Sequence, residues 1–286
     1  YLSGLSVEDL ELILHPMAEE GKEATGSMGD DTPVAVLSSH FRPVSHYFRQ
    51  NFSQVTNPPI DSLRENKVMS LKTRFGNLGN ILDFDNLTEE NIYVLDSPIL
   101  TNSQFKKFKK FFSKKTKVID CTFDISSSLK DRIEQIREEA ETSVRQGSTC
   151  LILSDQNISN NKASIPSILV VGAVHSHLVK HGLRGYCSLN VECSDALDTH
   201  SFAVLIGVGA TTVNPYLAID SIYQRFEKKL FGKSDFESCV VKFKKSIDAG
   251  LLKIMSKMGI SVISSYRGGC NFEAVGLSRA IVSDYF

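Results

Sequence analysis

Short apolar runs alternate with amphipathic helical patterns through the C-terminal part of the chain. The run at 150–154 is wholly apolar up to its last residue, as in strands buried on both faces of a parallel sheet. The positions Leu129, Ile133, Ile136, Ala140 and Val144 form one face of a helix. About six strands, each followed by a helix, recur at intervals of roughly 30 residues. The predicted strands lie at 92–95, 118–123, 150–154, 188–192, 211–214 and 260–266.

Repeated βα units of this kind predict an α/β fold with a mainly parallel sheet. Several predicted strands end in polar residues, which in a barrel gather on the functional rim at the C-terminal strand ends. These residues are Asp120, Asp155, Glu192, Asn214 and Tyr266. We therefore predict a TIM-barrel-like fold, incomplete if six units are all it has, with an open doubly wound sheet as the alternative.

The N-terminal part follows a different pattern, which predicts helices separated by irregular segments. A helix is predicted to begin at Ser6, and Pro59 is predicted to open a short helix that continues through Val68. A further helical face is formed by Val44, Phe48, Phe52 and Val55. We assign 1–90 as a helical and loop segment and 91–286 as the βα-repeat part of the same domain.

A proline-bounded polar segment at 54–61 is the sharpest local feature. Proline fixes its own φ and disfavours the helical region for the residue before it, so Pro58 holds Asn57 extended. The backbone groups of Thr56 and Asn57 are then left outside any helix, which suits a functional loop. An ordinary turn between two helices is the simpler alternative.

A second irregular segment contains Gly29, Asp30 and Asp31. Adjacent carboxylates suit acid/base chemistry or Mg²⁺ binding. Neighbouring side chains seldom point the same way, however, and an Asp before Thr-Pro often forms an Asx-turn. We interpret these three residues as a structural or interdomain loop, with no metal.

Composition excludes several classes of function. A net charge of −1 argues against a nucleic-acid partner, and no apolar run approaches the length of about 18 residues that predicts a membrane span. The six cysteines include no C-x-x-C pair, which favours free thiols in a reducing compartment over disulfides or a zinc cage. We also expect a piece of a longer protein, because the chain begins with Tyr1 and without a signal peptide.

Three further patterns have ordinary structural explanations. The lysine-rich run at 106–115 resembles a single-strand nucleic-acid binder, but its phenylalanines share one helical face and leave the lysines for solvent. His177 and His181 have the i, i+4 spacing of metal ligands, but no acidic ligand accompanies them as in H-E-x-x-H. The turn around Gly268 and Gly269 could hold a phosphate on its backbone N–H groups, although it lacks a full glycine motif.

Several motifs together resemble the central domain of the glutamate synthase large subunit. They include Gly-Ser-Met-Gly-Asp-Asp-Thr-Pro at 26–33 and Phe-Ser-Gln-Val-Thr-Asn-Pro-Pro-Ile-Asp at 52–61. Further matching stretches lie at 97–102, 151–155, 171–175, 214–218, 250–260, 265–269 and 272–277. The resemblance covers essentially the whole chain.

The resemblance implies a role within a larger enzyme. Glutamate synthase converts glutamine and 2-oxoglutarate into two glutamates, with reducing equivalents from NADPH, NADH or ferredoxin. An amidotransferase domain releases ammonia, and an FMN-binding barrel with a 3Fe-4S cluster uses it. The central domain joins the two and contributes to the ammonia tunnel, whose lining would include Thr56 and Asn57, followed by Pro58.

The resemblance further implies that this fragment holds no cofactor and no complete active site, so that catalytic residues are absent from it. Its partners would be the amidotransferase and FMN-binding domains of the same polypeptide, with a small reductase subunit or ferredoxin acting through the parent enzyme. A cytoplasmic location is expected, or a plastid in a photosynthetic eukaryote. Two alternatives stay open: a self-contained barrel-like enzyme that binds a phosphorylated small molecule, and a pure interaction module.

Overall fold

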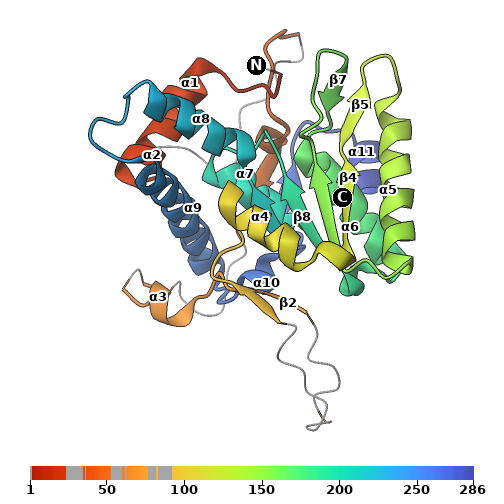
Figure 1. Ribbon diagram of the computed structural model, residues 1–286. Coiled ribbons are helices and arrows are strands. Elements are labelled where there is room, and N and C mark those ends of the chain that lie inside the picture. The colour runs from red at the N-terminus through yellow and green to blue at the C-terminus, as the bar shows by residue number, and fades with distance from the viewer. Residues whose placement is uncertain are drawn as a thin grey trace.

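Four parallel strands form the centre of the computed structural model (Figure 1). The structure describes residues 2–23, 35, 37–52, 60–61, 63–76, 82 and 92–286. The strands are β4 (Thr116–Asp120), β6 (Cys150–Ser154), β8 (Ser188–Glu192) and β9 (Thr212–Asn214). They are adjacent in chain order, β4-β6-β8-β9, with Asp120 opposite Ser154 and Ser154 opposite Glu192. The predicted βα repeat and parallel sheet are therefore confirmed for these units.

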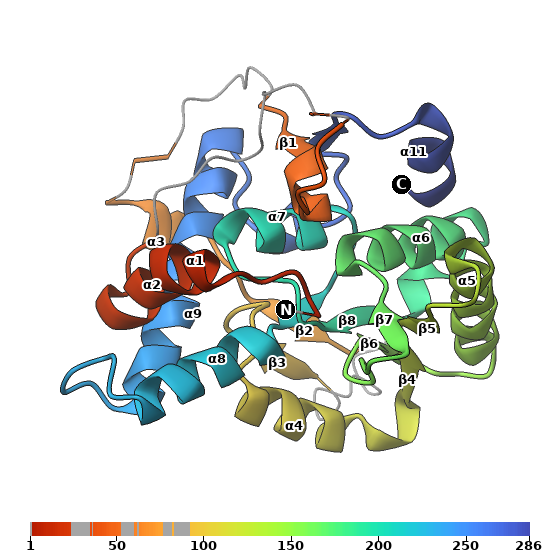
Figure 2. The same cartoon turned by 90° about the horizontal axis from the view of Figure 1, so that it is seen from above.

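Three helices cover one face of this sheet (Figure 2). They are α5 (Leu129–Arg145), α6 (Ser167–Lys180) and α7 (Thr199–Gly207), and each connects two successive parallel strands. Side chains cap the N-termini of α5 and α7. The Ser128 hydroxyl accepts a hydrogen bond from the N–H of Asp131, and the Asp198 carboxylate accepts one from the N–H of Ser201.

The other face of the sheet is covered by α4 (Asn102–Phe111) and by an antiparallel pair, β2 (Thr73–Phe75) and β3 (Tyr93–Leu95). Successive residues of a strand point to opposite faces. In β6, Leu151 and Leu153 accordingly join the core under α5 and α6, whereas Cys150 and Ile152 join the core under α4. This two-sided burial explains the continuous apolar run.

The N-terminal helices pack against the C-terminal half of the chain. α1 (Val7–Asp9), a π-helical turn (Leu10–Leu14) and α2 (His15–Glu20) follow one another, and α2 lies against α9 (Phe236–Met258). Ser6 caps the start as predicted, in a capping box with Asp9. Leu14 and Met17 are fully buried in the same core as the sheet residues, so both parts of the chain share one hydrophobic core.

The remaining elements are shorter, apart from α8. They are α3 (Glu65–Val68), β5 (Thr122–Asp124), β7 (Lys162–Ser164), α8 (Tyr216–Glu227), α10 (Ile263–Tyr266) and α11 (Arg279–Tyr285). β5 and β7 pair in antiparallel fashion beyond the ends of β4 and β6. No helix in the described ranges combines the length and apolar character needed to cross a bilayer.

The predicted helix at 44–55 is wrong over its described part. A 3-10 turn (Val44–Tyr47) leads into β1 (Phe48–Gln50), which pairs antiparallel with β10 (Phe272–Ala274). Phe48 and Gln50 are both buried, as in a strand with one inward face. This segment is a strand because it pairs with β10, which lies more than 200 residues later in the chain, although its local spacing is that of a helix.

The predicted strand at 260–266 is also wrong. Only Val262 forms a bridge there, to Ser70, and the chain then forms α10. Ile263 and Tyr266, which are three residues apart, are buried on one side of this short helix. The predicted strand at 92–95 exists as β3 but pairs with β2, so four of the six predicted strands form the parallel sheet.

Candidate functional site

The predicted tunnel residues Thr56, Asn57 and Pro58 lie outside the described residues. The predicted loop residues Gly29, Asp30 and Asp31 lie outside them as well. The structure does describe the two flanks of 53–59, which show where this segment leaves and rejoins the fold.

The N-terminal flank is fixed by a buried polar network. Gln50 Nε2 donates to the carbonyl of Asn271 at 2.9 Å, and the Tyr266 hydroxyl donates to Gln50 Oε1 at 2.7 Å. The N–H of Asn51 donates to the same Asn271 carbonyl at 2.8 Å. These bonds hold the end of β1 against the turn that precedes β10.

Both flanks also reach the last turn of α9. Lys257 Nζ lies 4.1 Å from the centroid of the Phe52 ring, a cation–π contact. On the other side of the segment, the Ser256 hydroxyl donates to the Ile60 carbonyl at 2.7 Å. The two residues that flank 53–59, Phe52 and Ile60, therefore contact adjacent residues of one helical turn.

A polar rim lies where the parallel strands end, as the sequence predicted. Asp120, Asp155, Glu192 and Asn214 all lie at the carboxyl ends of the four strands. Tyr266 does not belong to the rim, because it lies in α10 and bonds to Gln50. Sequence reasoning missed Lys109, Ser154 and Ser194, which come from α4 and from strand-end positions.

Glu192 is the buried anion of this rim. Lys109 Nζ lies 2.8 Å from its Oε1 and 2.9 Å from its Oε2, and the Ser154 hydroxyl donates to Oε2 at 2.8 Å. The Glu192 side chain is only 6% exposed, so Lys109 compensates a carboxylate that is largely removed from water. Lys109 is thus an exception to the predicted solvent-facing lysines of α4.

Asp155 and Asp195 are two further acidic residues of this rim, close enough for the charge of one to act on the other. Asp155 Oδ2 accepts from the N–H and the hydroxyl of Ser194, whereas its Oδ1 is buried without a hydrogen-bond partner among the described residues. Burial, and then the charge of Asp195, raises the pKa of Asp155 to about 6. Asp195 accepts from the N–H and hydroxyl of Ser167, and burial raises its pKa as well.

Most other rim groups are engaged in structural bonds. Asn214 Nδ2 donates to the Leu100 carbonyl and to Asn102 Oδ1, both at 2.9 Å. Burial raises the pKa of the Cys121 and Cys193 thiols, which argues against a thiolate nucleophile. Among the described rim residues, the arrangement is a hydrogen-bonded polar network in which Asp155 keeps one unpartnered oxygen and has a pKa raised to about 6.

The Gly268–Gly269 turn is not built as a phosphate cradle. The N–H of Gly268 donates to the Ile206 carbonyl and that of Gly269 donates to the Tyr266 carbonyl, each at 3.3 Å. The turn follows a short helix and leads into β10, not from a strand into a helix. Its amides are therefore committed to the protein, which does not favour the phosphate-binding alternative.

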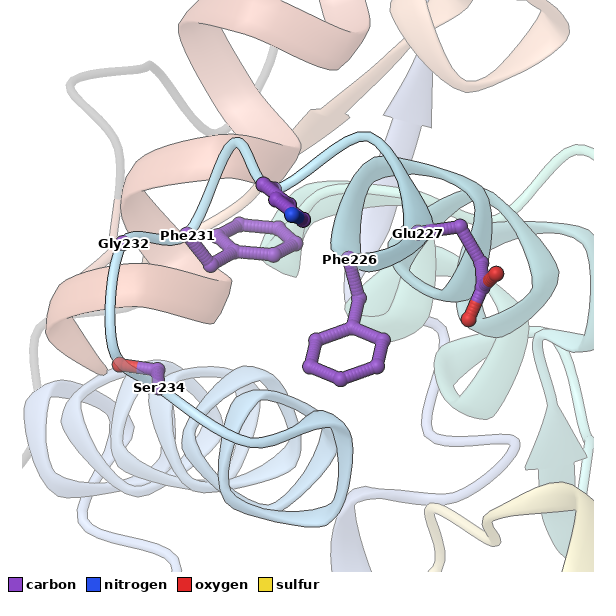
Figure 3. A pocket seen from close by; sticks show the side chains of 6 residues that line it. Phe226, Glu227, Phe231, Gly232 and Ser234 are labelled. Atoms are coloured by element: carbon purple, nitrogen blue, oxygen red, sulfur yellow. The ribbon is translucent and has the colours of Figure 1, made fainter.

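An open depression lies at the connection from α8 to α9 (Figure 3). Its lining consists of Phe226, Glu227, Lys229, Phe231, Gly232 and Ser234. Phe231 is stacked on His15, with ring centroids 4.9 Å apart. The depression presents the edge of a packed aromatic cluster and brings no set of catalytic side chains together.

The glutamate synthase central domain family matches residues 1–278. The chain belongs to this family. It is 58% identical over 99% of its length to the glutamate synthase [NADPH] large chain of Azospirillum brasilense, and 43% identical over 99% to that of Bacillus subtilis. The spinach (Spinacia oleracea) chloroplastic ferredoxin-dependent glutamate synthase is 40% identical over 99% of this chain.

The chain spans only 18–19% of the length of these relatives. Among solved structures, a flavocytochrome b2 variant with sulfite bound aligns at a TM-score of 0.47 and 10% identity, over 85% of this chain and 82% of that one. The glutamate synthase central domain thus accounts for nearly all of this chain but a small part of its relatives.

Proposed function

We propose that this glutamate synthase central domain links the amidotransferase domain to the FMN-binding domain and contributes to the ammonia tunnel between them. The observation that carries the proposal is the match of the whole chain to a region that is about a fifth of each large-chain relative.

The proposed tunnel contact is Thr56 with Asn57 and Pro58. Its support is the attachment of both flanking segments to Ser256 and Lys257 of α9, because a backbone-lined bore requires a loop whose ends are fixed. Gly29, Asp30 and Asp31 are proposed to form an interdomain loop. We also propose that 1–90 and 91–286 are two segments of the one domain.

The sheet is proposed to be an incomplete barrel. Its strands follow chain order, as in a singly wound barrel, and Ile99 extends it beyond β9 through a parallel bridge to Val213. We assign FMN and the 3Fe-4S cluster to the other parts of the parent enzyme. The electron donor, which is NADPH, NADH or ferredoxin, is assigned to those parts as well.

The test is Thr56→Trp in the full-length glutamate synthase that contains this chain. Ammonia must pass without escaping, so a bulky side chain in the bore should raise the ratio of glutamine hydrolysed to glutamate formed from 2-oxoglutarate. Thr142→Trp, at an exposed position of α5, is the matched control and should leave the ratio unchanged. An unchanged ratio in Thr56→Trp would show that the tunnel assignment is wrong.

A further inference from the structure

Three potential metal ligands from two helices converge on the outer surface of the domain. Glu141 belongs to α5, His177 lies in the last turn of the neighbouring α6, and His181 follows as the C-cap residue of that helix (Figure 2). His177 Nε2 lies 2.7 Å from Glu141 Oε2, and His181 Nε2 lies 3.8 Å from the same oxygen. All three ligand atoms lie within 4.8 Å of one another. The fold supplies the acidic third ligand that the sequence around the two histidines lacks.

This spacing is close to that of a tetrahedral metal site. Zinc–nitrogen and zinc–oxygen bonds of about 2.0–2.1 Å place neighbouring ligand atoms about 3.3 Å apart. The observed separations of 2.7 and 3.8 Å lie on either side of this value, so small side-chain rotations suffice. The two imidazole rings, with centroids 4.4 Å apart, come from positions i and i+4, the spacing used by helical zinc ligands.

The two carboxylate oxygens of Glu141 have different partners. Its Oε1 accepts from Arg145 Nε at 2.8 Å, which leaves Oε2 directed toward the histidines. An outer partner that orients a ligating carboxylate is a regular feature of metal sites.

The three ligands are partly exposed to solvent, and they lie on two helices that pack against each other. The side chains of His177 and Glu141 are 19% and 21% exposed, and that of His181 is 44% exposed. A cation can therefore enter from solvent, and a water molecule can complete its coordination. The α5–α6 contact beneath the ligands fixes their separation.

We propose that Glu141, His177 and His181 bind a divalent transition-metal cation of the Zn²⁺ type and so join α5 to α6. Two imidazoles select Zn²⁺, Ni²⁺ or Cu²⁺ over Mg²⁺ and Ca²⁺, which prefer sites made only of oxygen ligands. The site lies on the helical layer, away from the strand-end rim, and its role is to tie two βα units together.

The test is calorimetric titration of the chelator-treated, reduced 286-residue chain with ZnCl₂, followed by the same titration of single variants. We expect one Zn²⁺ per chain. The affinity for Zn²⁺ should be about ten- to hundredfold weaker, or weaker still, in His177→Gln and in Glu141→Gln. MgCl₂ should give no binding. Zn²⁺ should also raise the Tm of the unsubstituted 286-residue chain by a few degrees. The Tm of the double variant His177→Gln/His181→Gln should stay unchanged.

Two matched controls separate this site from other zinc ligands. His40→Gln removes an exposed histidine elsewhere, and Cys270→Ser removes the exposed thiol; neither should alter the stoichiometry or the affinity. Circular dichroism should confirm that all variants fold, because the altered side chains lie on the surface. Zinc binding that survives in the double histidine variant, is lost in Cys270→Ser or is absent from the parent chain would overturn the proposal.

Discussion

The Tyr266 hydroxyl donates a 2.7 Å hydrogen bond to Gln50 Oε1, and so joins positions 216 residues apart. Both side chains are buried, and Gln50 also donates to the Asn271 carbonyl. The bond fixes the end of β1, just before the segment at 53–59, to α10. The position of the flank that precedes the proposed tunnel loop therefore depends on the last part of the chain.

Replacing Tyr266 by Phe should destabilise the domain through this bond. Phenylalanine preserves the ring but leaves Gln50 Oε1 buried without a donor, which costs about 1–3 kcal/mol of unfolding free energy. Tyr223→Phe is the control, because that side chain is 49% exposed, and it should change the free energy by less than about 0.5 kcal/mol. Urea denaturation measures both, and equal effects would contradict the role assigned to the bond.

Lys109→Met should be more damaging than a change at a neighbouring lysine. It would leave Glu192 buried with a hydroxyl donor but without its cation, a loss of about 3–5 kcal/mol. Lys110→Met, on the exposed side of α4, should cost less than about 0.5 kcal/mol. Adding Glu192→Gln to Lys109→Met should restore part of the loss, and an absence of recovery would count against the ion pair.

Sequence patterns predict the elements of this fold where burial is uniform or strictly periodic. The β6 strand is apolar on both faces because each face carries its own core, and its predicted bounds agree with the structure. The helical spacing from Val44 to Phe52 is misleading, because β1 is stabilised by pairing with β10 at the other end of the chain. Local periodicity contains no information about such a distant partner.

The candidate sites show the same limit. The strand-end carboxylates are predictable, since parallel strands bring their carboxyl ends together. Lys109, which neutralises Glu192, is indistinguishable in sequence from the solvent-facing lysines of the same helix. Likewise, Glu141 lies 36 residues before His177, and only the packing of α5 on α6 brings them together.

Gly209→Ala should be far more destabilising than Gly147→Ala. Both glycines have a positive φ, +127° and +95°, so each alanine incurs a backbone penalty of about 1 kcal/mol. A Cβ at Gly209 would lie 2.3 Å from His175 Nδ1, whereas a Cβ at Gly147 would have nothing within 4 Å. The steric clash should add about 1–3 kcal/mol at Gly209. Similar unfolding free energies for the two variants would show that His175 can move away at little cost.

Asp155→Asn should change how the stability of the domain depends on pH. Burial and the charge of Asp195 raise the folded-state pKa of Asp155 to about 6, against about 3.9 in an unfolded chain. The folded protein thus holds this proton more tightly, so Asp155 favours folding at low pH. That contribution, about 2–3 kcal/mol of unfolding free energy, is lost as the pH rises from about 4 through 6. Its full size is expected because Asp155 is only 4% exposed.

Asparagine cannot ionise but can still accept from Ser194, so the variant should lack this loss. Its unfolding free energy relative to the parent chain should therefore rise by about 2 kcal/mol between pH 4 and pH 7.5 in urea denaturation. Asp248, whose pKa burial also raises to about 6, titrates in both proteins and cancels in the difference. Glu138→Gln, at an exposed position of α5, is the matched control and should give a difference that barely changes with pH. A flat difference for Asp155→Asn would mean that this carboxyl ionises in the folded domain as readily as in water. Its Oδ1, which is buried without a hydrogen-bond partner in the part of the chain that the structure describes, argues against that outcome.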